Sequence, residues 1–118
     1  MSEWIFDRSG TASAILDGDC VRDDSGEVVA WISGDNLYSP NGNHIGWFER
    51  GVLYDSNNDA IGFLRTATGL PSRPGLSGTP GMPGFSGRPG RPGFSGVPGK
   101  PGRGGWSSDD LADYLQQQ

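Results

Sequence analysis

The chain has 118 residues, of which 21 are glycine, nine are proline and 33% are hydrophobic. Its formal net charge is −5, which does not suit a nucleic-acid partner. The single cysteine, Cys20, excludes an intrachain disulfide.

The N-terminus, Met1-Ser2-Glu3-Trp4, lacks the basic region and apolar run of a signal peptide. No apolar stretch approaches the roughly 20 residues that a membrane-spanning helix needs. We therefore expect a cytoplasmic protein, although a virion or a cell surface reached by another route is also compatible with the sequence.

Residues 5–68 consist of four gapless repeats of sixteen residues: 5–20, 21–36, 37–52 and 53–68. One repeated position holds Gly10, Gly26, Gly42 and Asn58. Asparagine is the non-glycine residue that most readily accepts left-handed dihedrals, so this position predicts a turn with positive φ. A second turn in the repeat is marked by Gly18, Gly34 and Gly51. Each repeat is therefore predicted to be a hairpin of two short strands.

The second strand of each hairpin carries most of the apolar residues. Two adjacent positions hold Ile15, Trp31, Trp47 and Phe63, and then Leu16, Ile32, Phe48 and Leu64. Successive side chains point to opposite faces of a strand, so both faces are apolar here. Four hairpins give eight antiparallel strands, and closing them removes exposed edges. We predict an all-β fold, a shallow pseudo-fourfold barrel over residues 1–68, whose outer apolar face is either core or covered by the tail or a partner.

This repeat, with its D-x-S/N-G turn and its A/G-W/F-aromatic strand, resembles the four-fold β-flower domain over residues 4–68. That fold is distantly similar to tubby-like barrels, and the similarity implies phosphoinositide headgroups bound by basic residues. Residues 1–68 contain four arginines and eleven acidic residues, a formal charge of −7. Membrane lipid headgroups as a partner therefore have no support from charge.

The segment GWFERGVLYDSNNDAIGF (46–63) also resembles the repeats of cell-wall choline-binding modules. That resemblance implies an aromatic cage that holds a quaternary ammonium group by cation–π attraction. The candidate ligand-binding residues are Trp31, Trp47, Tyr38 and Tyr54. The alternative is that these residues are core residues and cross-strand pairs.

Residues 69–105 form a tail in which every third residue from Gly75 to Gly105 is glycine. A nine-residue unit is nested within it: GLSGTPGMP, GFSGRPGRP and GFSGVPGKP. A strict glycine period with proline is typical of collagen and predicts polyproline II conformation. Three arrangements remain open, namely a triple helix of three copies, one extended segment docked on a protein surface, and a linker. The apolar residues Phe85 and Phe94 argue against a purely solvated linker.

Residues 106–118 are predicted to contain a short amphipathic helix, with Ser107 or Ser108 as its N-cap. Such a short helix is marginal alone and needs a docking surface, either on the barrel or on a neighbouring copy. The candidate partner-binding residues of the tail and C-terminus are Phe85, Phe94, Trp106, Leu111, Tyr114 and Leu115. The expected partner is a second copy, in a homo-oligomer such as a trimer, or another protein.

No pattern in the sequence points to catalysis. The lone His44 and Cys20 form neither a metal site nor an activated nucleophile. The repeated Asp7, Asp23 and Asp55 lack the dense oxygen spacing of a calcium loop and are predicted to cap turns. We therefore expect no enzyme, no metal and no cofactor. The predicted function is a structural or interaction module, and a ligand-binding module is the alternative.

Overall fold

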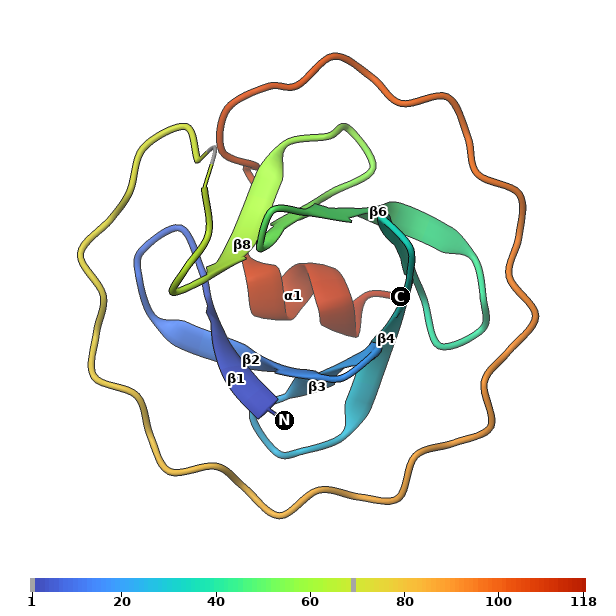
Figure 1. Cartoon of the computed structure of the whole chain (residues 1–118), viewed down its shortest axis with the longest axis horizontal. Coiled ribbons are helices and arrows are strands. Elements are labelled where there is room, and N and C mark those ends of the chain that lie inside the picture. The colour runs from blue at the N-terminus through green and yellow to red at the C-terminus, as the bar shows by residue number, and fades with distance from the viewer. Residues whose placement is uncertain (1, 69) are drawn as a thin grey trace.

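The computed structural model describes residues 2–68 and 70–118, which form eight strands and one short helix. Met1 and Gly69, at the predicted domain boundaries, lie outside the described residues. The elements are β1 (Ser2–Phe6), β2 (Ala12–Asp17), β3 (Cys20–Asp23), β4 (Val28–Ser33), β5 (Asn36–Tyr38), β6 (His44–Glu49), β7 (Val52–Tyr54), β8 (Ala60–Leu64) and α1 (Leu111–Gln116). Every strand pairs antiparallel with the next, and β8 pairs with β1. The predicted closed all-β barrel is confirmed (Figure 1).

The hairpin turns have the predicted backbone conformation. Gly26 has φ 91° and Asn58, at the equivalent position of the fourth repeat, has φ 63°. The side chain three residues earlier, an aspartate in three repeats and Ser39 in the third, caps each such turn; for example, Asp55 Oδ1 accepts the N–H groups of Asn57 and Asp59 at 2.9 and 3.0 Å. These carboxylates therefore satisfy turn amides.

The second set of turns differs from the prediction in one place. Gly18 and Gly34 have φ near 60°, and in the third repeat Arg50 takes this left-handed position with φ 53°. Gly51, which the sequence marked as the turn residue, follows it with φ 79°. The third turn therefore holds two successive residues at positive φ, the first of which is not glycine.

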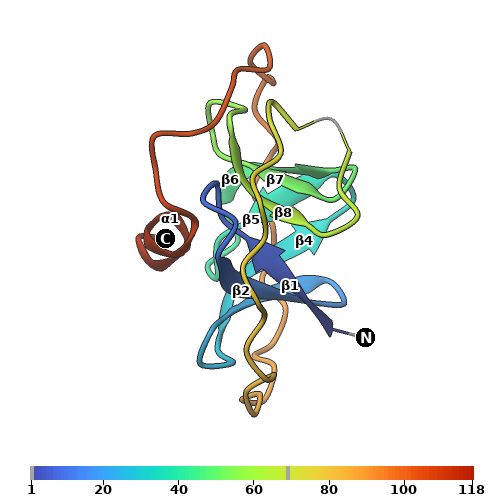
Figure 2. The ribbon, with the colours of Figure 1, turned by 90° about the vertical axis from the view of Figure 1, so that its left-hand side faces the viewer.

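The inner face of the barrel forms one apolar core that α1 closes at one end (Figures 1 and 2). Leu111 is fully buried in this core, and the missing side chain of Gly62 leaves it room, since a Cβ there would lie 2.9 Å from Leu111 Cδ2. The Tyr114 hydroxyl donates to the Ile45 carbonyl oxygen at 2.5 Å and accepts the N–H of Ser56. The helix is therefore part of the core.

The helix begins later than predicted. Asp110 is its N-cap residue and makes no side-chain cap. The Ser107 hydroxyl is used elsewhere, because it donates to Asp55 Oδ2 at 2.6 Å and accepts the N–H of Asp109 at 3.0 Å. Ser107 thus anchors the chain to a barrel turn.

The Gly-X-Y tail runs as one extended segment around the circumference of the barrel (Figures 1 and 2). Of the three arrangements left open by the sequence, the structure shows the tail docked on a protein surface, that of its own barrel. The outward-facing aromatic residues of the barrel form two clusters, to which Leu76 and Phe94 of the tail are added. The protein thus has an inner core filled by α1 and an outer apolar layer covered by the tail.

Candidate functional site

The most regular contact surface of the molecule is where the tail meets the barrel. We call it the tail-binding rim and define it by the four turn positions and the side chains beside them: Gly10, Gly26, Gly42 and Asn58, with Phe6, Arg22, Tyr38 and Tyr54. Both sets recur every sixteen residues. The rim therefore presents equivalent positions to the tail four times around the barrel.

Backbone hydrogen bonds place the tail in register with the rim. The N–H groups of Ser77, Ser86 and Ser95 donate to the carbonyl oxygens of Gly10, Gly26 and Gly42 at 2.8, 3.3 and 2.8 Å, respectively. In the fourth repeat, Asn58 Nδ2 donates to the Pro101 carbonyl oxygen at 2.9 Å. A step of nine residues in the tail therefore matches a step of sixteen residues in the barrel.

A second set of contacts stacks a tail side chain on three of the four rim side chains. Phe94 lies on Tyr38 with ring centroids 4.1 Å apart and an interplanar angle of 14°. The Arg103 guanidinium lies 3.9 Å above the Tyr54 ring, and the Phe85 ring lies 4.5 Å from the Arg22 guanidinium. Leu76 packs against the outer cluster that includes Phe6. Stacking and cation–π contacts of this kind stabilise a docked segment beyond the area that they bury.

The glycine column of the rim is required by how closely the tail approaches it. A Cβ built on Gly26 would overlap the carbonyl oxygen of Gly84, and the same holds for Gly10 with Gly75 and for Gly42 with Gly93. Among the tail glycines from 75 to 102, in contrast, an added Cβ would meet nothing within 4 Å. The glycines that the contact needs are therefore those of the barrel.

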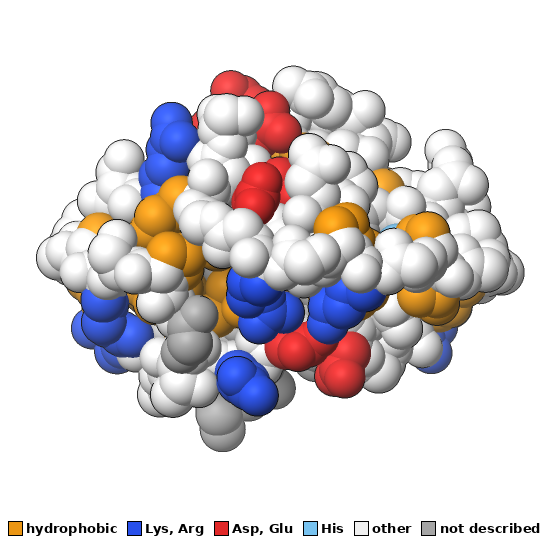
Figure 3. All heavy atoms as spheres, turned by 90° about the horizontal axis from the view of Figure 1, so that it is seen from above, with side chains coloured by type: hydrophobic (Ala, Val, Ile, Leu, Met, Phe, Trp, Pro, Cys, Tyr) orange, Lys and Arg blue, Asp and Glu red, His pale blue; other side chains and the backbone are white. Residues whose placement is uncertain are grey.

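Charge complementarity adds to this contact. Residues 1–68 carry eleven acidic residues, and the tail carries five basic residues and no acidic one. Lys100 contacts Glu49, and Arg103 Nη2 lies 3.6 Å from the same carboxylate. Figure 3 shows basic side chains next to acidic ones along this edge of the molecule. Exposed ion pairs of this kind each contribute little, so they support the contact without determining it.

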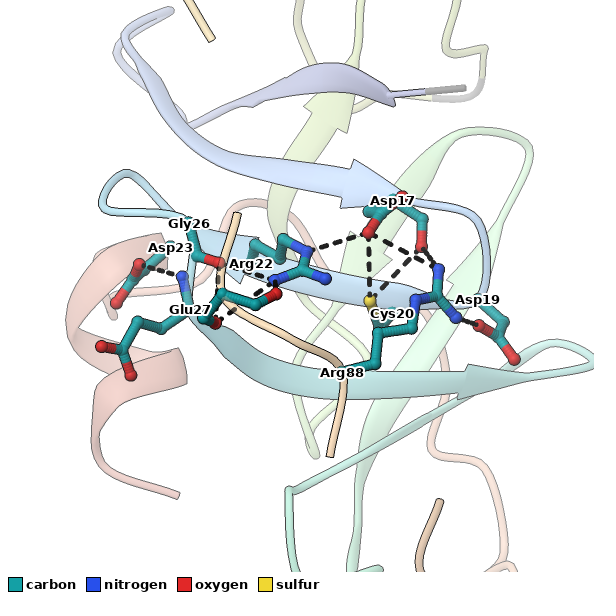
Figure 4. Close-up of polar contacts among 9 residues, drawn as sticks. Asp17, Asp19, Cys20, Arg22, Asp23, Gly26, Glu27 and Arg88 are labelled. Carbon is teal, nitrogen blue, oxygen red and sulfur yellow. Dashed lines mark hydrogen bonds and ion pairs between the residues drawn. The ribbon is translucent and has the colours of Figure 1, made fainter. Parts of the chain in front are cut away.

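The densest polar network lies where β2 meets β3 (Figure 4). Arg22 Nε donates to Asp17 Oδ2 at 2.8 Å, and Arg88 of the tail lies 3.5 Å from the same oxygen. Arg88 also donates to Asp19 Oδ1 at 2.5 Å. The hydrogen bond from Arg22 and the charge of Arg88 hold the pKa of Asp17 below its ordinary value, against the opposing effect of burial. The thiol of Cys20, buried beneath, has its pKa raised by desolvation.

Acid should lower the stability of the folded protein, in part by protonating Asp17. Because the pKa of Asp17 is depressed in the folded state, its contribution is present above the pKa of the unfolded chain and is lost as the pH falls through the folded value. We expect Asp17→Asn to lower Tm near neutral pH, and the difference from wild type to shrink below about pH 4. Thermal unfolding from about pH 6 to about pH 2 measures this. Asp24→Asn, at an exposed turn position, is the control, and a difference that stays constant over this range would contradict the expectation.

The four residues predicted to bind a ligand are brought to the same outer layer but are not open to solvent. Trp31, Trp47, Tyr38 and Tyr54 are each at most 5% exposed. Three of the rings are covered by the tail, because Lys100 Nζ lies 5.7 Å from the Trp47 ring, Arg103 lies on Tyr54 and Phe94 stacks on Tyr38. In this structure, the partner of the aromatic residues is therefore the chain's own tail.

The residues predicted to bind a partner lie in three places. Phe85 and Phe94 belong to the tail contact, and Leu111, Tyr114 and Leu115 lie in the inner core. Trp106 lies between these sets on the outer side of β8, with its ring 5.9 Å from the Phe63 ring and its Nε1 donating to Ser72 Oγ. All of them contact the barrel of the same chain.

Sequence reasoning missed the rim residue Arg22 and the tail residues Leu76 and Arg103, together with the three serines that set the register. One signal was available. Each nine-residue tail unit has an apolar residue and a serine after its first glycine, and the three units plus the closing GRG equal the four barrel repeats in number. That numerical match was the only hint that the two repeats pair.

The same architecture is found in a known family. The family model of the 4-fold beta flower protein matches residues 3–115. The chain belongs to this family. The resemblance seen in residues 4–68 is thereby confirmed, and the β-flower match also spans the tail and ends within α1. No curated protein and no solved structure matches the chain.

Two further observations concern the described part of this β-flower protein. Its helix, six residues long, is too short to cross a membrane. Within residues 2–68 and 70–118, no group of three or more histidine, cysteine or acidic side chains is arranged to hold a metal ion.

Proposed function

We propose that this β-flower protein is a non-enzymatic interaction module in which the barrel is a receptor for a Gly-X-Y segment followed by an amphipathic helix. Within one chain the receptor is filled by its own tail and α1. The protein assembles when the barrel of one copy receives the tail and helix of another copy. A protein partner with a similar segment would use the same surface.

The observation that carries this proposal is the register of the tail on the rim. Three hydrogen bonds from Ser77, Ser86 and Ser95 recur at equivalent rim positions, and each is accompanied by the preceding tail side chain packed on the outer face of the barrel. A linker needs no such match, because its only requirement is to span a distance. A recognition segment needs it, since each repeat of the segment must meet the same chemistry.

The contacts also follow a known mode of peptide recognition. Polyproline II segments bind aromatic-lined grooves, and their stiff backbone loses little entropy on binding. Here Tyr38 and Tyr54 supply the aromatic faces, and the turn carbonyls supply hydrogen-bond acceptors for a backbone that makes none of its own. The helix then adds apolar burial at the barrel end through Leu111 and Leu115.

Exchange between copies keeps every one of these contacts, because the same residues meet in cis and in trans. Whether the tail binds its own barrel or that of another copy depends on the connection between the end of β8 at Leu64 and Ser77, the first tail residue hydrogen-bonded to the rim. Short connections disfavour closure within one chain and promote swapping. The concentration of chains and the length of this connection should therefore set the balance.

Shortening the connection tests the proposal. We expect removal of residues 70–72 to convert the protein into dimers or larger closed rings, as measured by light scattering coupled to size exclusion. Insertion of three glycine and serine residues after Pro71 is the matched control and should stay monomeric. In native mass spectrometry, isotope-labelled and unlabelled copies of the shortened variant should form mixed assemblies.

One outcome of this experiment would contradict the proposal. A shortened variant that is folded and monomeric at every concentration, with its Ser86 and Ser95 amides open to hydrogen exchange, would show that a displaced tail is not taken up by another barrel. In that case the tail and helix serve only to complete their own barrel.

A further inference from the structure

The barrel has four seams where the last strand of one repeat meets the first strand of the next beneath the tail. The first seam, between β2 and β3, pairs Asp17 with Cys20. The closing seam, between β8 and β1, pairs Leu64 with Ile5, and the sixteen-residue repeat makes Arg65 and Trp4 the counterparts of Asp17 and Cys20. The two seams can therefore be compared residue by residue.

Side chains fill the first seam. The guanidinium groups of Arg22 and Arg88 both reach Asp17, and Cys20 is fully buried beneath them (Figure 4). One of these arginines comes from the barrel and the other from the tail. The barrel thus supplies the acid of this seam and the tail supplies a matching cation.

The closing seam has the opposite chemistry. The repeat places Phe6 where the first seam has Arg22, and the tail unit places Thr79 where it has Arg88. Phe6 is apolar and Thr79 is shorter than the arginine of the first seam, and Arg65 takes the place of Asp17. The result is a cavity of about 310 Å³ between the barrel and the tail, whose lining includes Glu3, Trp4, Phe6, Arg65, Thr79 and Met82.

This cavity has an apolar wall and one cation without a counterion. Trp4 and Phe6 are 8% and 1% exposed and form part of the wall, whereas Met82 of the tail is 43% exposed. The Arg65 guanidinium lies 5.4 Å from the Phe6 ring, and among the described residues no carboxylate lies within ion-pair distance of it. The tail cannot supply the anion, because residues 69–106 contain no acidic side chain.

We propose that this cavity binds a small molecule with a flat apolar body and a carboxylate. The body packs against Trp4, Phe6 and Met82, and the carboxylate pairs with Arg65, whose planar guanidinium suits two parallel hydrogen bonds. The volume is within the range of small-molecule sites. The site shares Phe6 with the tail-binding rim, but it lies beside the serine hydrogen bonds that set the register and does not depend on exchange of the tail.

Binding of benzoate to the full chain tests the proposal, with benzyl alcohol and benzylamine as neutral and cationic probes of similar shape. Tryptophan fluorescence and amide chemical shifts of the residues around Trp4 report occupancy. We expect benzoate to bind about tenfold more tightly than benzyl alcohol, and benzylamine to bind most weakly.

Two substitutions at the cavity should act in opposite directions. Arg65→Gln should weaken benzoate binding about tenfold and leave benzyl alcohol within about twofold, since only the anion contact is lost. Glu3→Gln should strengthen benzoate binding, because it removes a negative charge from the lining of the cavity. Arg91→Gln removes the same charge as Arg65→Gln at a different seam and serves as the control.

Thr79→Phe fills the cavity from the exposed tail and should abolish binding of all three probes without lowering Tm. Any of three results would overturn the proposal: benzoate fails to bind at about 10 mM, benzylamine binds more tightly than benzoate, or Arg65→Gln leaves benzoate binding unchanged.

Discussion

Replacing Gly26 with alanine is expected to lower the free energy of unfolding by about 2–4 kcal/mol. Gly26 has φ 91°, a conformation that costs an L residue energy, and the new Cβ would overlap the carbonyl oxygen of Gly84. The tail must move away there, which breaks the hydrogen bond from Ser86 and the contact of Phe85 with Arg22. Urea unfolding followed by circular dichroism measures the change.

Gly87→Ala is the matched control within the tail. A Cβ at Gly87 would meet nothing within 4 Å, and its backbone is not left-handed. Alanine also restricts the unfolded chain, so the variant should be as stable as wild type or more stable by about 0.4–1 kcal/mol. In a triple helix the same substitution would be disruptive, because only glycine fits the crowded axis. Equal damage from both substitutions would therefore argue for a triple helix and against the docked tail.

Truncation after Gly105 should have the second large effect. It removes Leu111, Tyr114 and Leu115 from the inner core, and each large apolar side chain contributes about 1.5–3 kcal/mol before ordering costs. It also opens one end of the barrel. We expect Tm to fall by roughly 10–25 °C, and the truncated chain to associate at high concentration. Calorimetry and light scattering measure the two effects.

Point variants separate the helix contact from a general effect of shortening. Leu111→Ala should cost about 2–5 kcal/mol, because Leu111 is fully buried and fills the space above Gly62. Gln116→Ala removes only an exposed side chain that donates to Asp23 Oδ2, and it should be nearly neutral. A truncated protein that melts and sediments like the full chain would mean that α1 does not stabilise the barrel.

The barrel could be predicted from the sequence because its information is local and repeated. A glycine column that tolerates Asn58 indicates positive φ, and adjacent apolar positions such as Trp47 and Phe48 indicate a strand with two apolar faces. Four copies of the same hairpin leave closure as the simplest way to pair every edge. The exception is Arg50, whose left-handed backbone nothing in its own repeat indicates.

The path of the tail could not be predicted from its own residues. A period of three places glycine, apolar and proline or serine residues on separate faces of a polyproline II helix, and each face can contact many surfaces. The predicted ligand residues Trp47 and Tyr54 illustrate the consequence. Their aromatic faces suit a cation, but the sequence did not indicate that Lys100 and Arg103 of the same chain lie on them.

The wrapped tail has a consequence for folding during synthesis. The last strand of the barrel ends at Leu64, whereas the helix that fills its open end is made later, after the tail. At about 5–20 residues per second, the ribosome needs several seconds to synthesise the chain after β8. During this interval the nascent barrel exposes apolar surface at that end and on its circumference, and a chaperone or a neighbouring nascent chain can reach both. The tail cannot form competing strands in the meantime, because its prolines and glycines disfavour them.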